Sequence, residues 1–351
     1  MKKWILIPAL LAGASSCHNR DITFDDYERQ TVYFPVQYPV RTLSLGNDVV
    51  DNSLDRQHKF NIGVCVGGYY DHNKQDWQVN FTVDPSLIPD GYLKNSDGAV
   101  LKALPSAYYT LSPSDMVTIP EGSFNGLIEV QLSDTFFEDP LSITGCYAIP
   151  LRLTASSGTD NILHGTPASD APSPPDVHIA SHWEVLPMDY TLFGIKYVNR
   201  YHGQWLRRGQ MVRRNHAGEI VEITVYHAEF VEYGEVVTLA TSSLHSVVSG
   251  MSVGTDHIEL HLLAGQNGSL SVASTAESPV TVSYGSGLYK ENGDAWGGTP
   301  ENPTRRDAIY LNYFYEKIID SQAYTCEIID TLVFRDRGIK YEAGRPTVVI
   351  N

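Results

Sequence analysis

The sequence predicts an all-β protein in which an immunoglobulin-like β-sandwich is followed by a lipocalin-like antiparallel β-barrel. Short stretches of alternating apolar and polar residues, separated by turn residues, indicate half-buried strands. A Pro-rich segment near the middle divides the 351 residues in two. A chain of this length exceeds one typical hydrophobic core, so two domains are expected.

The first sixteen residues have the layout of a signal peptide. Lys2 and Lys3 precede an apolar run over 4–12 and a group of small residues at 13–16, and Cys17 follows directly. The apolar run is too short to span a bilayer, which requires about twenty residues. Small residues leading into a cysteine resemble a bacterial lipobox, so residues 1–16 are predicted to be removed and Cys17 to carry lipid. The alternative is an ordinary secretory signal with a cysteine there by chance.

The segment 17–27 is interpreted as a short lipidated tether. It contains Asp21, Asp25 and Asp26, which resemble the surface-export signals of Bacteroidetes lipoproteins. The predicted location is therefore the outer membrane, lipid-anchored on the cell surface, with the periplasmic face as the alternative. The lipid supplies the membrane attachment, because each buried methylene contributes about 0.8 kcal/mol.

The charge balance argues against a nucleic-acid partner. The formal net charge is −16, and loss of Lys2 and Lys3 with the signal peptide makes it −18. Binding to phosphate backbones requires a basic surface that such a chain lacks.

Residues 28–155 are predicted to form the sandwich. Apolar residues alternate within 60–66, 79–83, 128–132 and 147–153, and turn residues separate these stretches. Because an exported protein permits disulfides, Cys65 and Cys146 are the expected pair, with two free thiols as the alternative. Cys326 is expected to be a buried free cysteine.

Residues 156–182 are interpreted as a linker, and residues 183–351 as the barrel. The predicted barrel strands are 190–198, 219–231, 236–240, 257–263, 269–273, 280–284, 308–315 and 325–334. Gly203 and Trp205 form a Gly-x-Trp near the start, and Arg335 and Arg337 follow the last strand. In lipocalin-like barrels an early tryptophan is covered by a late arginine, so these four residues are predicted to close the barrel.

Most motifs that would identify an enzyme are absent from the sequence. It contains no His-Glu-x-x-His, P-loop or Cys-x-x-Cys pattern. Histidines 178, 182, 202 and 216 lack metal-ligand spacing, and they are interpreted as surface or linker residues. No catalytic residue, metal or cofactor is predicted.

Carbohydrate binding is the function that the remaining residues favour, because sugar rings stack on aromatic side chains while amides and carboxylates bind the hydroxyls. The segment 285–305 is predicted to be a loop, and its candidate ligand-binding residues are Tyr289, Asn292, Asp294 and Trp296. The alternative is that Trp296 plugs the barrel mouth and the polar residues cap turns. A weaker candidate is the group formed by Tyr69, Tyr70 and Trp77 with nearby polar residues.

Several motifs carry a resemblance to known families. Leu104-Pro105 to Tyr108-Tyr109, Val117 to Gly122 and Tyr147 to Leu151 make residues 28–155 resemble the Bacteroidetes lipoprotein domain DUF1735. The C-terminal half is similar to DUF5627, and the stretches that carry this similarity are 201–205, 296–298, 306–313 and 330–337. The resemblance implies a protein encoded near systems that capture and degrade glycans. It implies no catalytic residue.

The sequence therefore predicts a non-enzymatic surface lipoprotein that binds an oligosaccharide or polysaccharide as an accessory of a polysaccharide-utilisation system. One alternative is a structural or assembly role beside an outer-membrane transporter or a neighbouring lipoprotein. A second is an unrecognised glycoside hydrolase, and a third is a small apolar ligand inside the barrel.

Overall fold

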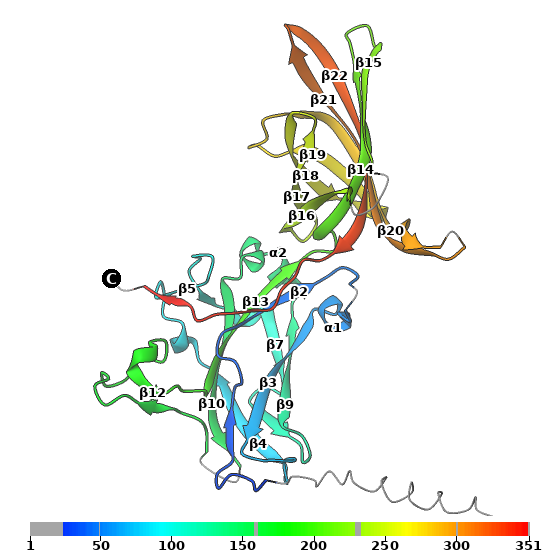
Figure 1. The fold of residues 1–351 in the computed structure, drawn as a ribbon. Helices are drawn as coiled ribbons and strands as arrows, with labels where there is room; N and C mark the ends of the chain where they lie inside the picture. The colour runs from blue at the N-terminus through cyan, green and yellow to red at the C-terminus, as the bar shows by residue number, and fades with distance from the viewer. Residues whose placement is uncertain (1–23, 49, 158–160, 229–232, 300, 350–351) are drawn as a thin grey trace, which may run out of the picture.

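The computed structural model describes residues 24–48, 50–157, 161–228, 233–299 and 301–349. The predicted signal peptide, Cys17 and most of the tether lie outside these ranges. Two β units are stacked end to end, with the sandwich below and the barrel above (Figure 1). The all-β prediction is confirmed, as is the barrel in the C-terminal part.

The sandwich consists of two facing sheets. The first has the order β1-β3-β9-β7, and the second has the order β23-β2-β13-β10-β4-β8 with β6 added beside β10. Strand bounds in the first sheet are β1 Thr31–Tyr33, β3 Lys59–Gly67, β9 Asn125–Leu132 and β7 Tyr109–Ser112. In the second they are β23 Glu342–Ala343, β2 Pro39–Ser44, β13 Tyr190–Val198, β10 Tyr147–Ser156, β4 Trp77–Val83, β8 Met116–Ile119 and β6 Lys102–Ala103.

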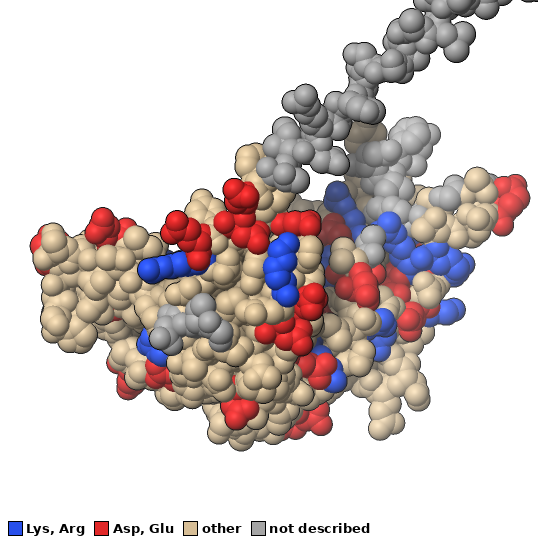
Figure 2. Space-filling model, turned by 90° about the horizontal axis from the view of Figure 1, so that it is seen from below, with Lys and Arg blue, Asp and Glu red and all other residues tan. Residues whose placement is uncertain are grey.

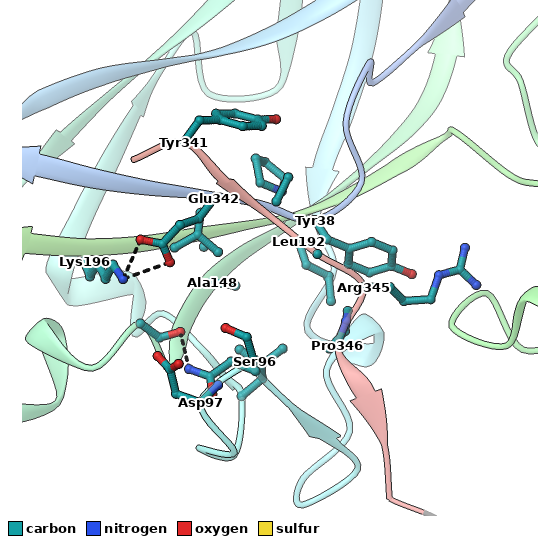
Figure 3. Close-up of a pocket in the computed structure, with 18 residues that line it drawn as sticks. Tyr38, Ser96, Asp97, Ala148, Leu192, Lys196, Tyr341, Glu342, Arg345 and Pro346 are labelled. Carbon is teal, nitrogen blue, oxygen red and sulfur yellow. Dashed lines mark hydrogen bonds and ion pairs between the residues drawn. The ribbon is translucent and has the colours of Figure 1, made fainter. Parts of the chain in front are cut away.

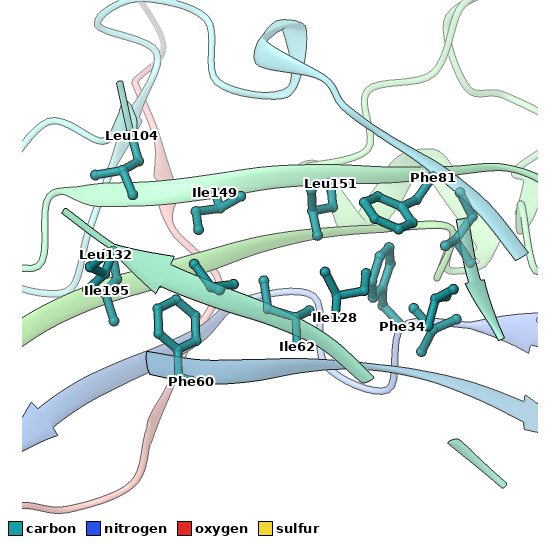
Figure 4. Close-up of a cluster of buried hydrophobic side chains, with 14 of the residues drawn as sticks. Phe34, Phe60, Ile62, Phe81, Leu104, Ile128, Leu132, Ile149, Leu151 and Ile195 are labelled. Carbon is teal, nitrogen blue, oxygen red and sulfur yellow. The ribbon is translucent and has the colours of Figure 1, made fainter. Parts of the chain in front are cut away.

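Alternation explains why these segments form strands. In β3 every second residue is buried, from Phe60 to Val66, and β9 repeats the pattern. Their side chains meet those of β10 and β13 between the sheets, where Phe34, Ile62, Ile128, Ile149 and Leu151 lie together (Figure 4). The interior of the sandwich is therefore an apolar layer.

Short helices and connecting strands complete this half. The helical segments are α1 Ser53–Arg56, α2 Asp134–Glu138, η1 Pro85–Leu87, η2 Ser106–Tyr108, η3 Pro140–Ile143 and η4 Ala180–His182. The small strands are β5 Leu93–Lys94 with β24 Thr347–Val348, and β11 Thr166–Pro167 with β12 Trp183–Val185.

The barrel is one antiparallel sheet in the order β15-β14-β16-β17-β18-β19-β20-β21-β22. Eight strands close into a ring because β14 pairs with β22 as well as with β16, while β15 is attached outside the ring. The bounds are β14 Gly203–Arg214, β15 Ile220–Tyr226, β16 Glu235–Ser243, β17 Ser246–Val253, β18 Asp256–Ala264, η6 Gln266–Gly268, β19 Ser269–Ser274, β20 Val282–Gly298, β21 Pro303–Ile319 and β22 Gln322–Asp336.

The barrel interior is filled. Apolar side chains pack around Trp205 and Tyr313, and a buried ion pair joins Arg207 Nε to Asp330 Oδ2 at 3.0 Å. The hydroxyl of Tyr226 donates to Asp330 Oδ1 at 2.5 Å, and that of Tyr313 donates to Oδ2 at 3.3 Å. Side chains thus occupy the space that a small apolar ligand in the lumen would need.

The predicted domain boundary at residue 183 differs from the structure. Strand β13, predicted to belong to the barrel, pairs with β10 and β2 inside the sandwich. Its residues are buried on both faces, so they match a central sheet position better than the alternating wall of a barrel.

The predicted linker also differs. His178 is buried, and Ile162 forms a parallel bridge with Val32, so much of 161–182 packs along the sandwich. Its contacts come from isolated side chains and backbone groups, which leave no periodic pattern in the sequence.

A polar junction joins the two halves. Asn199 donates from Nδ2 to the carbonyl oxygens of Ser243 and Ser246, both at 2.8 Å. Arg337, at the end of the barrel, donates to the carbonyl of Asn47 at 2.6 Å and to that of His202 at 2.6 Å. Gly46 lies against the Arg337 guanidinium, where a Cβ atom would collide with it.

Candidate functional site

The C-terminal chain crosses back from the barrel to the sandwich. We call residues 339–348 the strap. Glu342 and Ala343 pair in antiparallel register with Val40 and Pro39 of β2, and β24 then pairs with β5. Figure 1 shows the strap, coloured red, lying across the sandwich. It adds a strand to an edge that β2 would otherwise leave open.

The strap covers a pocket, here called the strap pocket, of about 280 Å³. Leu101, Ala148 and Leu192 are buried and supply apolar lining. Figure 3 shows the strap on one side and the loop with Ser96 and Asp97 on the other. Apolar surface with a few polar groups around it is the usual composition of a small-molecule site.

Polar side chains converge on this pocket from three elements. Lys196 of β13 pairs with Glu342 of the strap, with Nζ at 2.9 Å from Oε1. Asp97 is exposed, and Asn95 fixes its loop by accepting hydrogen bonds from the backbone of Asp97 at 3.1 Å and Ala99 at 2.8 Å. The pocket therefore offers carboxylate acceptors and an ammonium donor over an apolar surface.

One end of the strap pocket is held by a hydrogen-bonded group of rings. The hydroxyls of Tyr38 and Tyr190 are 2.5 Å apart, and His178 Nδ1 lies 3.3 Å from the Tyr38 hydroxyl. Burial raises the pKa of Tyr38 and lowers the pKa of His178, so both are neutral near pH 7. Arg345 of the strap lies over the Tyr38 ring at 5.6 Å, which ties the strap to this group.

A second pocket, of about 390 Å³, lies beside the first and shares Pro39, Val40 and Tyr341 with it. Its lining is mainly apolar and includes Phe34, Ile62, Phe193 and Ile339. Tyr341 is 78 % exposed and contributes to both pockets. Its ring is accessible to a ligand in either one.

The loop predicted at 285–305 is instead a long hairpin made by β20 and β21. Tyr289 is buried there; its hydroxyl donates to Asp307 Oδ2 at 2.6 Å, and burial followed by this bond raises its pKa. Its ring meets Tyr201 edge-on at 5.2 Å, so Tyr289 is not a stacking surface for sugar.

The other three predicted residues are Asn292, Asp294 and Trp296. Among the described side chains, they form no binding site together with Tyr289. The backbone N–H of Asn292 donates to Asp307 Oδ1 at 3.0 Å, and Asp294 forms an ion pair with Arg208. The backbone of Trp296 belongs to β20, but its side chain lies outside the described residues. The binding role of Trp296 therefore stays a prediction.

The weaker aromatic candidate is part of the sandwich. Trp77 is buried in the core, and its Nε1 donates to Asn73 Oδ1 at 3.0 Å. Asn73 donates in turn to the carbonyl of Pro120 at 3.0 Å. This pair closes a turn and leaves no indole face for a ligand.

The predicted barrel closure is present in a modified form. Trp205 is fully buried and packs edge-on against Phe334 at 5.4 Å, and the Arg337 guanidinium covers Phe334 at 4.3 Å rather than Trp205 itself. Gly203 has φ +137° and lies against Asp336, where a Cβ atom would collide with the backbone. Arg335 is exposed and takes no part. The ring of Phe334 was the missing member of the prediction.

The expected disulfide does not form. Cys65, Cys146 and Cys326 all carry free thiols, and Cys326 is buried as predicted. Cys65 belongs to β3 of the first sheet, whereas Cys146 directly precedes β10 of the second. Cys65 alternates with the buried residues Val64 and Val66, so its side chain points away from the second sheet, whereas Cys146 is buried.

The histidine prediction is wrong for two residues. His178 is buried, and its Nε2 donates to the carbonyl of Leu87 at 2.8 Å. His202 accepts at Nδ1 from the backbone of Thr241 at 3.1 Å, and burial followed by the charge of Arg337 lowers its pKa to about 4. Within the described parts of the chain, no three His, Cys, Asp or Glu side chains gather in a way that could hold a metal ion.

Sequence reasoning missed the strap pocket. Its residues come from the region of β2, the segment 95–101, the start of β10, β13 and the strap, and none of these segments carries a binding motif. The sequence offered one signal, the stretch from Tyr341 to Pro346. It combines an aromatic residue, two charged residues and turn-forming residues, a composition typical of an exposed segment.

Two family profiles match the chain. An N-terminal domain profile covers residues 27–160, and the profile of DUF5627, a domain of unknown function, covers residues 200–338. The chain is 36 % identical in sequence to a protein of unknown function from Bacteroides ovatus whose crystal structure is known. The two structures match with a TM-score of 0.78 over 93 % of this chain and 99 % of that one. The chain belongs to this two-domain DUF5627 family.

A second solved structure is a distant match to the DUF5627 protein described here. It is an auxiliary nutrient binding protein from Bacteroides thetaiotaomicron, 10 % identical, with a TM-score of 0.34 over 78 % of this chain and 82 % of that one. That similarity is too low to support an inference. No curated protein matches the chain.

Proposed function

We propose that this DUF5627 protein is a non-enzymatic, lipid-anchored outer-membrane protein that binds a glycan in the strap pocket as an accessory of a polysaccharide-utilisation system. The observation that carries the proposal is the convergence of Asp97, Lys196 and Glu342 over an apolar surface, beside the exposed ring of Tyr341. Sugars present the same combination of apolar faces and hydroxyl edges.

The size and exposure of the pocket suit the end of a chain or a short oligosaccharide. Carboxylates accept hydrogen bonds from sugar hydroxyls, and Lys196 donates to a ring or hydroxyl oxygen. Three charged groups and one aromatic ring give weak affinity for a single site, and display of many copies on one surface offsets this weakness.

Attachment to the membrane rests on Cys17 and the signal-peptide layout. Within the ranges that the structure covers, no helix is both long enough and apolar enough to cross a membrane. Exchange of Cys17 for Ser is expected to move the protein from the membrane fraction to the soluble fraction, as seen on an immunoblot after fractionation. Retention of the variant in the membrane fraction would contradict the lipid anchor.

Calorimetry and a glycan array test the binding site directly. Tyr341→Ala and Asp97→Ala are each expected to weaken glycan binding about tenfold, because each removes an interaction worth roughly 1–2 kcal/mol. Asp320→Ala, in the β21–β22 turn of the barrel, is the matched control and should bind like the wild type. Binding that is lost equally in Asp320→Ala, or unchanged in both pocket variants, would place the site elsewhere.

The same two carboxylates allow a test for hydrolysis. Glycosidases need a pair of acids in one cleft, and the strap pocket contains Asp97 and Glu342. Glu342 already forms an ion pair with Lys196, a state suited to accepting hydrogen bonds rather than to protonating a leaving group. We therefore expect no release of reducing ends from a glycan that binds. Release that stops in Glu342→Gln would make the protein a hydrolase.

A further inference from the structure

Strand β15 has an open edge. It is the last strand of the barrel sheet, and among the described residues its paired neighbour is β14 alone. Unpaired backbone groups on an edge can pair with another strand, so natural edges are usually protected by lysine, proline or inward charges. The central part of this edge, Glu222 to Tyr226, contains neither lysine nor proline.

The outward side chains of β15 are apolar and exposed. Ile223 is 55 % exposed and Val225 is 65 % exposed. Val225 is in register with Gln210 of β14 and Ile329 of β22, and Ile329 is itself 40 % exposed. Because Gln210 lies between Val225 and Ile329, the exposed apolar surface at this edge is that of the edge strand itself.

The charge on this edge is locally neutralised. Glu222 is the single charged residue between Ile220 and Tyr226, and it forms an ion pair with Arg213 of the adjacent strand. The whole chain carries a formal net charge of −16, so two copies repel each other over most surfaces. Because the Glu222 charge is paired with Arg213, β15 itself adds little to this repulsion.

The edge is complementary to itself. Regular pairing with β14 extends from Glu222 to Tyr226, because the irregularity in register falls at Val221. An antiparallel pair of β15 strands centred on Thr224 sets Ile223 opposite Val225 of the second copy, Thr224 opposite Thr224, and Glu222 opposite Tyr226. This register places apolar residues together and puts no like charges opposite each other.

We infer that two copies of this protein associate through antiparallel pairing of their β15 edges, centred on Thr224, with the exposed apolar side chains of Ile223 and Val225 at the contact. Such an interface is isologous, because the same strand contributes on both sides. It is smaller than a standard interface of about 1,600 Å², so the association is weak in dilute solution and strengthens when copies are concentrated on one surface.

Cysteine crosslinking in cells that make the full chain tests the register. Thr224→Cys brings two thiols face to face, so a disulfide-linked band of twice the chain mass is expected on a non-reducing gel. Thr238→Cys is the matched control, since Thr238 is exposed on β16, a strand paired on both sides, and it should give at least tenfold less dimer. The wild-type chain shows the background from the native thiols.

Substitution of the contact gives a second, independent readout. Ile223→Lys is expected to lower the association constant of the purified full chain at least tenfold in light scattering over a concentration series. Leu263→Lys, at a residue 46 % exposed on β18, should associate like the wild type. A wild-type chain that is monomeric at every concentration overturns the inference. So does a Thr224→Cys chain that crosslinks no more than Thr238→Cys, or that crosslinks to a protein of another mass.

Discussion

The sandwich and the barrel are both antiparallel β structures, but they fill their interiors with different chemistry. Between the sandwich sheets lie apolar side chains such as Ile128 and Leu151. The barrel contains a comparable apolar cluster and, in addition, the ion pair of Arg207 with Asp330 and the tyrosine hydroxyls around it. The layer between the sandwich sheets is thus stabilised by apolar packing, whereas part of the barrel interior depends on a polar network that is destabilised when one member is removed.

The two interiors also differ in where they leave space. Pockets of about 280 and 390 Å³ open at the surface of the sandwich beside the strap, while side chains fill the lumen of the barrel. A barrel fold therefore does not by itself imply a ligand in the lumen. In this protein the strap pocket, where glycan binding is proposed, belongs to the sandwich half.

Among the substitutions that test this difference, removal of Arg207 is expected to have the largest effect on stability. Arg207→Met leaves Asp330 buried without its cation, and burial already raises the pKa of that carboxyl. The free energy of unfolding of the barrel should fall by about 3–5 kcal/mol. Chemical denaturation followed by tryptophan fluorescence measures the loss.

A double variant shows whether the lost stability comes from the charge left unpaired. Arg207→Met combined with Asp330→Leu removes both charges and should recover most of the loss, because a well-packed apolar replacement of a buried ion pair is often neutral. In the core between the sandwich sheets, where no charge is involved, Leu151→Ala should cost about 2–5 kcal/mol through lost apolar burial and the cavity left behind. A double variant as unstable as Arg207→Met would mean that the lost side-chain volume, and not the charge, is responsible.

The smaller expected effect is a dependence on pH at the junction between the halves. The pKa of His202 is about 4 in the folded protein, below its ordinary value near 6.5, so the folded state favours the neutral ring. This stabilisation is complete above pH 6.5 and is lost as the pH falls from 6.5 towards 4, by up to about 3 kcal/mol. Asparagine retains an acceptor for the Thr241 backbone but does not titrate.

The free energy of unfolding measured at a series of pH values should therefore fall less steeply for His202→Asn than for the wild type between pH 6.5 and 4. Any slope that remains in the variant is assigned to other groups, including His178, whose pKa burial also lowers. Identical slopes for the variant and the wild type would show that His202 does not titrate in this range.

The sequence predicted many of the longer strands because alternation is a direct consequence of having one face buried. Strands β3, β4, β9 and β10 were identified in this way. Strand β14 was missed because four arginines, among them Arg207, interrupt its apolar pattern, and Arg207 points inward to a carboxylate on β22. An inward charge cannot be distinguished from an outward one without knowing its partner.

The candidate site could not be predicted for a related reason. The strap pocket needs Val40 and Glu342 to be neighbours, and they lie at opposite ends of the chain. The glycan-binding residues predicted from the sequence were aromatic and polar residues close together in the chain. One of them, Tyr289, is instead buried and packs inside the barrel. Local composition indicates which residue types are present but not which of them face solvent.

The return of the strap makes the barrel an insertion within the sandwich rather than a domain added after it. Two chain crossings connect the halves, one near Asn199 and one near Arg337, so rotation about a single backbone hinge cannot turn the barrel freely. The order of synthesis matters as well. The sheet edge at β2 stays uncovered until Glu342 and Ala343 have been made, so the strap pocket forms only after all the barrel strands have been synthesised.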